Sequence, residues 1–167
     1  ARRALDKARA RVACLIGALP EEVVFTSGGT EANNLGILGA VAGATCRRPG
    51  IVTTAIEHQA VLNPCLHLET SGRVLTLLPV DRDGMLCVAE ALAALRDDVQ
   101  LASIMLANND VGTVQPVGAL AERARKLGIV LHTDAVQAVG KMRVDVKALG
   151  VDLLSFSGHK LYGPQGV

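Results

Sequence analysis

Two side chains of this sequence, one amine and one carboxylate, have the chemistry to hold a cofactor between them. Lys160 follows the apolar run 151–156, and Asp134 closes another apolar run, 129–133. Apolar runs of this length are typical of buried strands, so both groups are expected at strand ends. An amine can form a Schiff base with an aldehyde, and a carboxylate can keep a pyridine nitrogen protonated. The pair therefore predicts a site for pyridoxal 5′-phosphate (PLP), with Lys160 as a catalytic residue.

Each member of the pair also has a purely structural explanation. A single lysine is most often an exposed surface charge, although the apolar run and the Ser-Gly-His context favour a site for Lys160. Asp134 can instead be the N-cap of a helix over 135–139. An unpaired buried carboxylate is costly, however, so the cofactor interpretation requires a cationic group beside Asp134.

A tight turn at residues 27–30 precedes a helical pattern and predicts an anion site. The sequence Ser-Gly-Gly-Thr places backbone N–H groups and a helix N-terminus where a phosphate is stabilised. The hydroxyls of Thr30 and Ser157 and the imidazole of His159 can add to this site. The alternative is a plain turn in which Thr30 is the N-cap of the helix.

Further polar residues are predicted at the same edge of the fold. His58 follows a strand and opens a helix, where an imidazole can lie on a pyridine ring and transfer protons near neutral pH. Gln137 comes one helical turn after Asp134 and can reach the phenolic oxygen of the ring. Asn108 and Asn109 end the most apolar strand, as turn formers or as ligand contacts. Backbone bonding by His58 and solvent exposure of Gln137 are the structural alternatives.

The elements that must position these residues alternate between strand and helix. Apolar runs predict strands at 22–26, 50–54, 73–78, 100–107, 129–133 and 152–156. Helical periodicity predicts helices at 2–17, 30–41, 58–70 and 88–96, from near Pro116 to 126–128, and briefly at 145–149. This alternation predicts an α/β fold with a mostly parallel sheet and helices on both faces. Ligands of such sheets bind at the carboxyl ends of the strands, which is where the candidate residues fall.

The composition limits the possible classes of protein. The chain has 167 residues, half of them hydrophobic and 2% aromatic, with a net charge of +1. This length suits a single domain over 1–167, and the balanced charge gives no footprint for nucleic acid. No apolar run is long enough to span a membrane. Four dispersed cysteines predict a reducing, cytoplasmic compartment and no metal site. Cys65, His67 and His132 are expected to be structural.

Five motifs, in order along the chain, resemble those of cysteine desulfurases of the NifS/IscS type. The motifs are FTSGGTEANN at 25–34, EHQAVL at 57–62, NNDVGTVQP at 108–116, HTDAVQ at 132–137 and SFSGHKLYGP at 155–164. The resemblance implies a PLP-dependent, homodimeric enzyme of the class-V aminotransferase family with a fold-type I large domain. Residues 1–167 would form most of that domain, without the N-terminal segment and the C-terminal small domain.

The resemblance also implies roles for the site residues and an activity. It implies that the phosphate is bound by Gly29, Thr30, Ser157 and His159. It implies a ring-stacking and catalytic His58, and contacts of Asn109 and Gln137 to the phenolic oxygen or the substrate. It also implies that Asp134 pairs with the ring nitrogen and that the cofactor is attached covalently at Lys160. The implied reaction removes sulfur from L-cysteine, giving L-alanine and an enzyme persulfide. The sulfur would then pass to an acceptor protein such as an iron–sulfur scaffold.

The sequence departs from this family's pattern in several places. The aromatic-Asp-x-x-Ala-Thr-Thr opening, the nucleophilic cysteine, the arginine for the substrate carboxylate and a threonine donated by the other subunit have no counterpart in residues 1–167. We therefore expect a fragment of a longer protein that cannot complete the reaction alone. A selenocysteine lyase of the same family is the nearest alternative. A non-catalytic α/β phosphate-binding or interaction module is the more distant one.

Overall fold

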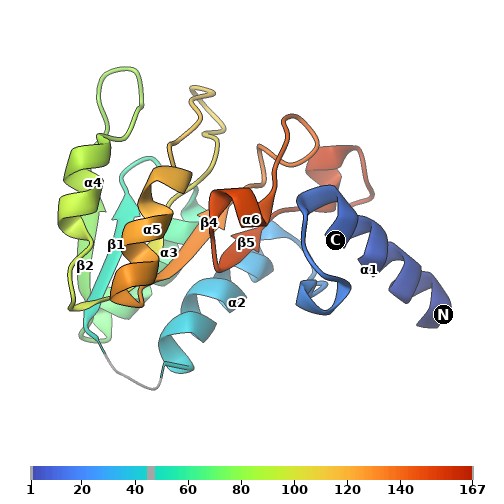
Figure 1. The fold of residues 1–167 in the computed structure, drawn as a ribbon, viewed down its shortest axis with the longest axis horizontal. Coiled ribbons are helices and arrows are strands. Elements are labelled where there is room, and N and C mark those ends of the chain that lie inside the picture. The colour runs from blue at the N-terminus through green and yellow to red at the C-terminus, as the bar shows by residue number, and fades with distance from the viewer. Residues whose placement is uncertain (1, 45–47, 167) are drawn as a thin grey trace.

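A five-stranded, all-parallel sheet forms the centre of the computed structural model, which describes residues 2–44 and 48–166 (Figure 1). The strand order is β2-β1-β3-β4-β5. The strands are β1 (Gly50–Thr54), β2 (Val74–Leu78), β3 (Val99–Ser103), β4 (Val130–Asp134) and β5 (Leu153–Ser155). Every residue of β1 and β3 is buried, because these central strands are covered on both faces.

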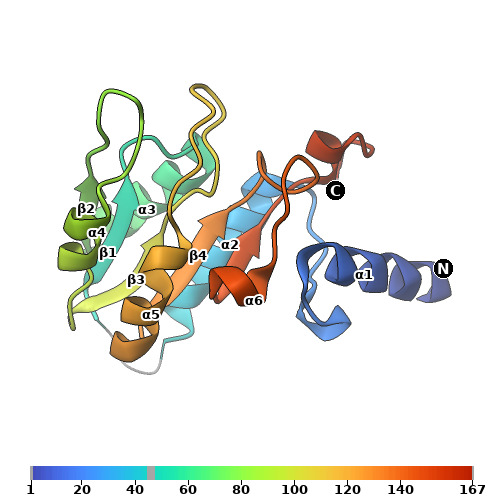
Figure 2. The same cartoon turned by 45° about the horizontal axis from the view of Figure 1, so that its top comes forward.

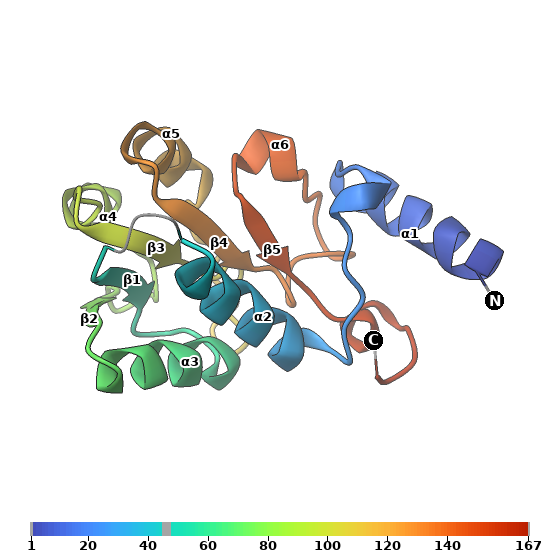
Figure 3. The same cartoon turned by 90° about the horizontal axis from the view of Figure 1, so that it is seen from below.

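Helices cover both faces of the sheet, as predicted (Figure 3). On one face lie α2 (Gly29–Ala42) and α3 (Gln59–Thr70), and on the other lie α4 (Val88–Ala94), α5 (Gly118–Leu127) and α6 (Val146–Leu149). The first helix, α1 (Arg2–Ile16), lies beside the β5 edge of the sheet (Figures 1 and 2). Two 3-10 turns, η1 (Pro20–Glu22) and η2 (Gly158–Leu161), complete the elements. None of the helices in the described ranges combines the length and apolar character needed to cross a membrane.

The core consists almost entirely of aliphatic side chains in two clusters. The smaller cluster lies under α2 and α3 and contains Ile37, Val41, Ile51, Val61, Cys65 and Leu101. The larger cluster occupies the other face, beneath α4 and α5. Burial raises the pKa of the Cys65 thiol to about 12, so this residue packs as a small apolar group, as predicted.

The strand order reverses direction between β1 and β3. The chain passes from β1 through α3 to β2 on one side, and then through α4 to β3 on the other side of β1. The loops that follow β1 and β3 therefore diverge and leave a crevice at the carboxyl ends of these strands. His58 follows β1 and Asn109 follows β3, so both belong to this crevice.

The predicted strand at 22–26 is wrong. Pro20 starts the 3-10 turn η1, and the residues that follow it pair with no strand in the described part of the chain. They are held instead by α1, where the Arg9 guanidinium donates to the Val23 carbonyl and lies 5.0 Å from the centroid of the Phe25 ring. This extended, apolar segment connects η1 to α2 and does not form a strand, because no strand in the described part of the chain pairs with it.

The predicted strand at 100–107 is longer than the observed β3, which ends at Ser103. Beyond Ser103 the backbone still bonds to β4, because the Ile104 N–H donates to the His132 carbonyl at 3.0 Å and the Leu106 N–H donates to the Asp134 carbonyl at 2.8 Å. Between them, the Met105 N–H donates to the buried carboxyl group of Glu57, at 2.8 Å. The segment after β3 is thus bonded both to β4 and to a residue from the loop after β1.

His132 on β4 is fully buried and connects three strands. Its Nδ1 lies 2.8 Å from the Ser103 hydroxyl on β3, and its Nε2 lies 3.0 Å from the Ser155 hydroxyl on β5. Gly36 of α2 passes over the ring, where a Cβ atom would come within 3.4 Å of it. Burial lowers the pKa of His132 to about 4, so the ring is neutral, as expected of a structural residue.

The buried His132 should make stability depend on pH in acid. Between its ordinary pKa of about 6.5 and about 4, the unfolded chain binds a proton at this ring that the folded protein does not bind. The free energy of unfolding is therefore expected to fall as pH drops through this window, by at most about 1.4 kcal/mol per pH unit. Urea titrations of wild type and His132→Gln check this, since the variant should lose that part of the slope. The exposed His67→Gln should keep the wild-type profile, and equal slopes in all three proteins would contradict the assignment.

Candidate functional site

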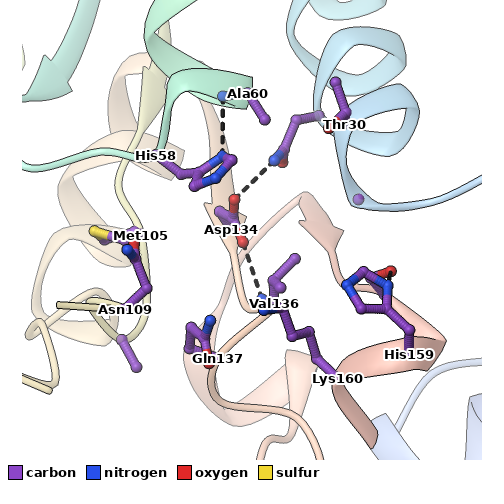
Figure 4. A pocket seen from close by; sticks show the side chains of 14 residues that line it. Thr30, His58, Ala60, Met105, Asn109, Asp134, Val136, Gln137, His159 and Lys160 are labelled. Carbon is purple, nitrogen blue, oxygen red and sulfur yellow. Dashed lines mark hydrogen bonds between the residues drawn. The ribbon is translucent and has the colours of Figure 1, made fainter. Parts of the chain in front are cut away.

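A cavity of about 320 Å³ opens at the carboxyl ends of the strands (Figure 4). It collects residues from the start of α2, from the loops after β1 and β3, from the end of β4 and from the segment after β5. Its lining residues are Gly29, Thr30, Asn33, His58, Ala60, Met105, Ala107, Asn109, Asp134, Val136, Gln137, Ser157, His159 and Lys160. All nine of the predicted site residues are among them.

Asp134 is the buried charge of this cavity, with 5% of its surface exposed. Its Oδ1 accepts from the Val136 N–H at 2.9 Å, and its Oδ2 accepts from Asn33 Nδ2 at 2.7 Å. Burial raises the pKa of Asp134, while the two hydrogen bonds and the nearby His58 oppose the rise. The alternative of a helix N-cap is partly right, because Asp134 does accept a backbone N–H, but residues 135–139 form a turn.

Asn33 is a site residue that sequence reasoning missed. It is 1% exposed, and its side chain donates across 101 positions of sequence to Asp134. Its Oδ1 is buried on the wall of the cavity and has no hydrogen-bond partner among residues 2–44 and 48–166. The available signal was its spacing: Asn33 lies three residues after Thr30, one turn further along the same face of α2.

The turn before α2 exposes a helix N-terminus to the cavity. The N-cap is Gly28 (φ 145°), which makes no side-chain cap, so the alternative that Thr30 is the N-cap is wrong. Thr30 lies inside the first turn and is exposed. A Cβ atom on Gly29 would come within 3.0 Å of Val136, so the close approach of α2 to the Asp134 turn requires a small residue. A second hollow of about 280 Å³ shares Gly29, Thr30 and His159 with the cavity.

His58 is the N-cap of α3 and also lines the cavity. Its Nδ1 accepts from the Ala60 N–H at 3.1 Å, so in the neutral ring the proton is on Nε2. The backbone-bonding alternative and the cavity-facing position are thus compatible in one geometry. Figure 4 shows the ring beside Asp134.

Lys160 and His159 come from η2, directly after the loop that follows β5. The His159 Nδ1 lies 2.8 Å from the hydroxyl of Ser157, which is 1% exposed. Lys160 is exposed and lines the same cavity as Asp134, so the amine and the carboxylate do converge as expected (Figure 4). Convergence required the parallel sheet, which brings the ends of β4 and β5 side by side.

The remaining predicted residues, Gln137 and Asn109, also line the cavity. Gln137 is half-buried, and its side-chain oxygen accepts from Lys141 Nζ. It is therefore less exposed than the solvent-facing alternative requires. Asn108 is the turn former of its pair, because its Oδ1 accepts from the N–H groups of the next turn, and Asn109 is the one that lines the cavity.

No cysteine of the described residues lines the cavity. Cys65 is buried in the core, and Cys14 and Cys87 are exposed elsewhere on the molecule. Cys46 lies outside the described residues. The cavity therefore offers an amine, a carboxylate, hydroxyls and imidazoles, but no thiol from these positions.

A family profile and the sequences of curated proteins both relate this chain to one family. The profile of the aminotransferase class-V family matches residues 1–167. Cysteine desulfurase IscS of Dictyoglomus turgidum is 49% identical over 166 residues, which cover 99% of this chain and 42% of that protein. Cysteine desulfurase IscS of Pectobacterium atrosepticum is 48% identical over 167 residues, which cover 100% of this chain and 41% of that protein.

Solved structures share both the fold and much of the sequence. The structure titled "SspA in complex with cysteine" superposes with a TM-score of 0.93 at 39% identity, covering 98% of this chain and 47% of that one. A "NIFS-LIKE PROTEIN" superposes with a TM-score of 0.90 at 41% identity, covering 97% of this chain and 45% of that one. The chain thus spans less than half the length of these relatives. Since the family profile covers the whole chain, the chain belongs to the class-V aminotransferase family.

Proposed function

We propose that residues 1–167 form most of the PLP-binding large domain of a cysteine desulfurase. The observation that carries this proposal is a buried carboxylate, Asp134, that shares one cavity with the amine of Lys160. The relatives named above are cysteine desulfurases, which supports the same activity for the protein that contains this chain.

The residues of the cavity fit PLP on three counts. In the described part of the chain, no lysine or arginine forms an ion pair with Asp134, so the buried carboxylate suits a protonated ring nitrogen. The open N-terminus of α2, with Thr30, Ser157 and His159 around it, suits a phosphate. A volume of about 320 Å³ is within the usual range for small-molecule sites.

PLP, when bound, supplies the electron sink for bond cleavage at the α carbon of an amino acid. The chain's own residues then have separate tasks. Asp134 Oδ2 and Oδ1, held by Asn33 and the Val136 N–H, keep a negative charge at the buried end of the cavity. Lys160 Nζ would hold the cofactor covalently and would serve as the base for the α proton of the substrate. His58 presents a ring face and an Nε2 proton.

For sulfur removal, a protein thiolate would attack the sulfur of L-cysteine. The C–S bond breaks, an S–S bond forms, and L-alanine leaves while the enzyme keeps a persulfide. Because Cys14, Cys65 and Cys87 do not line the cavity, we place this thiolate outside the described residues. A homodimer, a sulfur-acceptor protein such as an iron–sulfur scaffold, and a cytoplasmic location remain predictions that follow from the family.

Covalent attachment at Lys160 is the first test. After incubation with PLP and reduction with borohydride, mass spectrometry of tryptic peptides should find the pyridoxyl group on the peptide that contains Lys160. Lys160→Ala should abolish the label, whereas Lys141→Ala, which removes a nearby exposed amine, should retain it. With L-cysteine and a thiol reductant such as dithiothreitol, which reduces the persulfide and releases its outer sulfur as sulfide, the whole protein should release alanine and sulfide in equal amounts. Lys160→Ala should release neither. Labelling spread over surface lysines, or alanine release by Lys160→Ala, would contradict the proposal.

Asn33→Ala tests how the carboxylate is held. Loss of the Nδ2 donor should raise the pKa of Asp134 further and weaken its pairing with a cationic ring. We expect PLP affinity, measured by absorbance titration, to fall about tenfold, the usual effect of removing a hydrogen bond to a charged group. Asn34→Ala is the matched control, because within the described part of the chain the Asn34 side chain donates only to the Thr30 carbonyl, at 2.8 Å. Equal affinities for the two variants would exclude the role of Asn33.

A further inference from the structure

Glu57 precedes His58 and is buried, with 5% of its surface exposed. Its Oε1 accepts two hydrogen bonds, from the Thr54 hydroxyl at 2.7 Å and from the Met105 N–H at 2.8 Å. Thr54 ends β1, and Met105 lies just beyond the end of β3. One carboxyl oxygen therefore ties together the two loops that diverge at the crevice.

A second side chain, Asn108, also connects the loop after β3 to the loop after β1. Asn108 Nδ2 donates to the Ile56 carbonyl at 3.0 Å, and Asn108 Oδ1 accepts from the N–H groups of Asp110 and Val111. The two tying residues, Glu57 and Asn108, each come directly before a cavity residue. The position of His58 relative to Asn109 is thus set by hydrogen bonds made by their neighbours.

The second oxygen of Glu57 shows the protonation state that fits this place. Oε2 is buried and has no hydrogen-bond partner among the described residues. Burying an ionised carboxylate with one unpaired oxygen costs much more free energy than burying the neutral acid. Burial raises the pKa of Glu57 to about 8, against the bonds from Met105 and Thr54, and repulsion from Asp134 adds to the rise.

We propose that Glu57, as a neutral carboxylic acid, is a positioning residue that fixes His58 against Asn109 across the cofactor cavity and leaves the negative charge of the cavity on Asp134. The proposal deepens the function proposed above and rests on it for the identity of the cofactor. Neutrality has a physical purpose here, because a second buried negative charge would raise the pKa of Asp134 and favour its protonated form.

Two substitutions at this position separate hydrogen bonding from charge. Glu57→Gln keeps an acceptor oxygen for Thr54 and Met105 and is neutral at every pH, whereas Glu57→Leu keeps the approximate size but leaves both donors unpaired. In the whole protein, we expect Glu57→Gln to bind PLP within about threefold of wild type and Glu57→Leu to bind it about tenfold or more weakly. Absorbance titration of the apo protein measures both.

The ¹⁵N spectrum of the histidine side chains provides the second readout. In wild type and Glu57→Gln, His58 should show an unprotonated Nδ1 and a protonated Nε2, as its bond from Ala60 requires. In Glu57→Leu the two nitrogens should move toward the averaged shifts of a free imidazole. Val61→Ala is the matched control, because it removes buried volume from α3, the helix that His58 caps, without removing any hydrogen bond of Glu57. In this variant the melting temperature should fall while the His58 signals stay unchanged.

Three outcomes would overturn the proposal. They are equal loss of PLP affinity in Glu57→Gln and Glu57→Leu, wild-type behaviour of Glu57→Leu in both measurements, or the same His58 change in Val61→Ala. If wild type itself fails to bind PLP, the proposed function is wrong, but the His58 spectra of the apo proteins still decide the positioning role of Glu57.

Discussion

The burial of one carboxylate at the end of β4 is the constraint on which the rest of the site depends. Asp134 is removed from water and receives hydrogen bonds from Asn33 and from the Val136 N–H, yet no lysine or arginine of the described residues pairs with it. Two neutral donors lower the cost of its burial without cancelling it, which is why its pKa stays raised. A site that keeps such a charge is suited to a cationic ligand.

The same carboxylate explains the shape of the surrounding structure. Helix α2 must come close enough for Asn33 to reach Asp134, and it does so over two glycines: Gly29 against Val136, and Gly36 over the ring of His132. Small residues on this face of α2 therefore allow polar contacts between the helix and the sheet. The approach also brings the N-terminus of α2 to the cavity, so one packing arrangement places both the carboxylate and a helix N-terminus, which favours negative charge, on the cavity wall.

Two buried ionisable groups near the cavity, His132 and Glu57, make structural hydrogen bonds, whereas Asp134 lines the cavity itself. His132 is neutral because burial lowers its pKa to about 4, and it holds three strands together through two serines. Glu57 has its pKa raised to about 8 by burial and connects the loops after β1 and β3. In both groups burial favours the neutral form, and the neutral side chain makes hydrogen bonds that connect neighbouring segments. Asp134 is the buried carboxylate that lines the cavity, together with the exposed amine of Lys160.

The sequence by itself determined the alternation of strands and helices and the residues at the strand ends. Continuous apolar runs mark β1, β3 and β4, and all nine predicted residues reached one cavity, because the carboxyl ends of parallel strands share an edge. These features are encoded locally, in the period of hydrophobic residues and in the polar residues that end each run.

Only the tertiary structure decided which polar groups pair and which extended segments find a sheet. The 22–26 segment has the pattern of a strand but is held by Arg9. Beyond β3, the Met105 N–H donates to the side chain of Glu57. Asn33 and Asp134 meet across 101 residues, and no local pattern specifies such a contact. Hydrogen-bond partners and burial depend on how distant segments pack, and this packing also sets the pKa of each buried group.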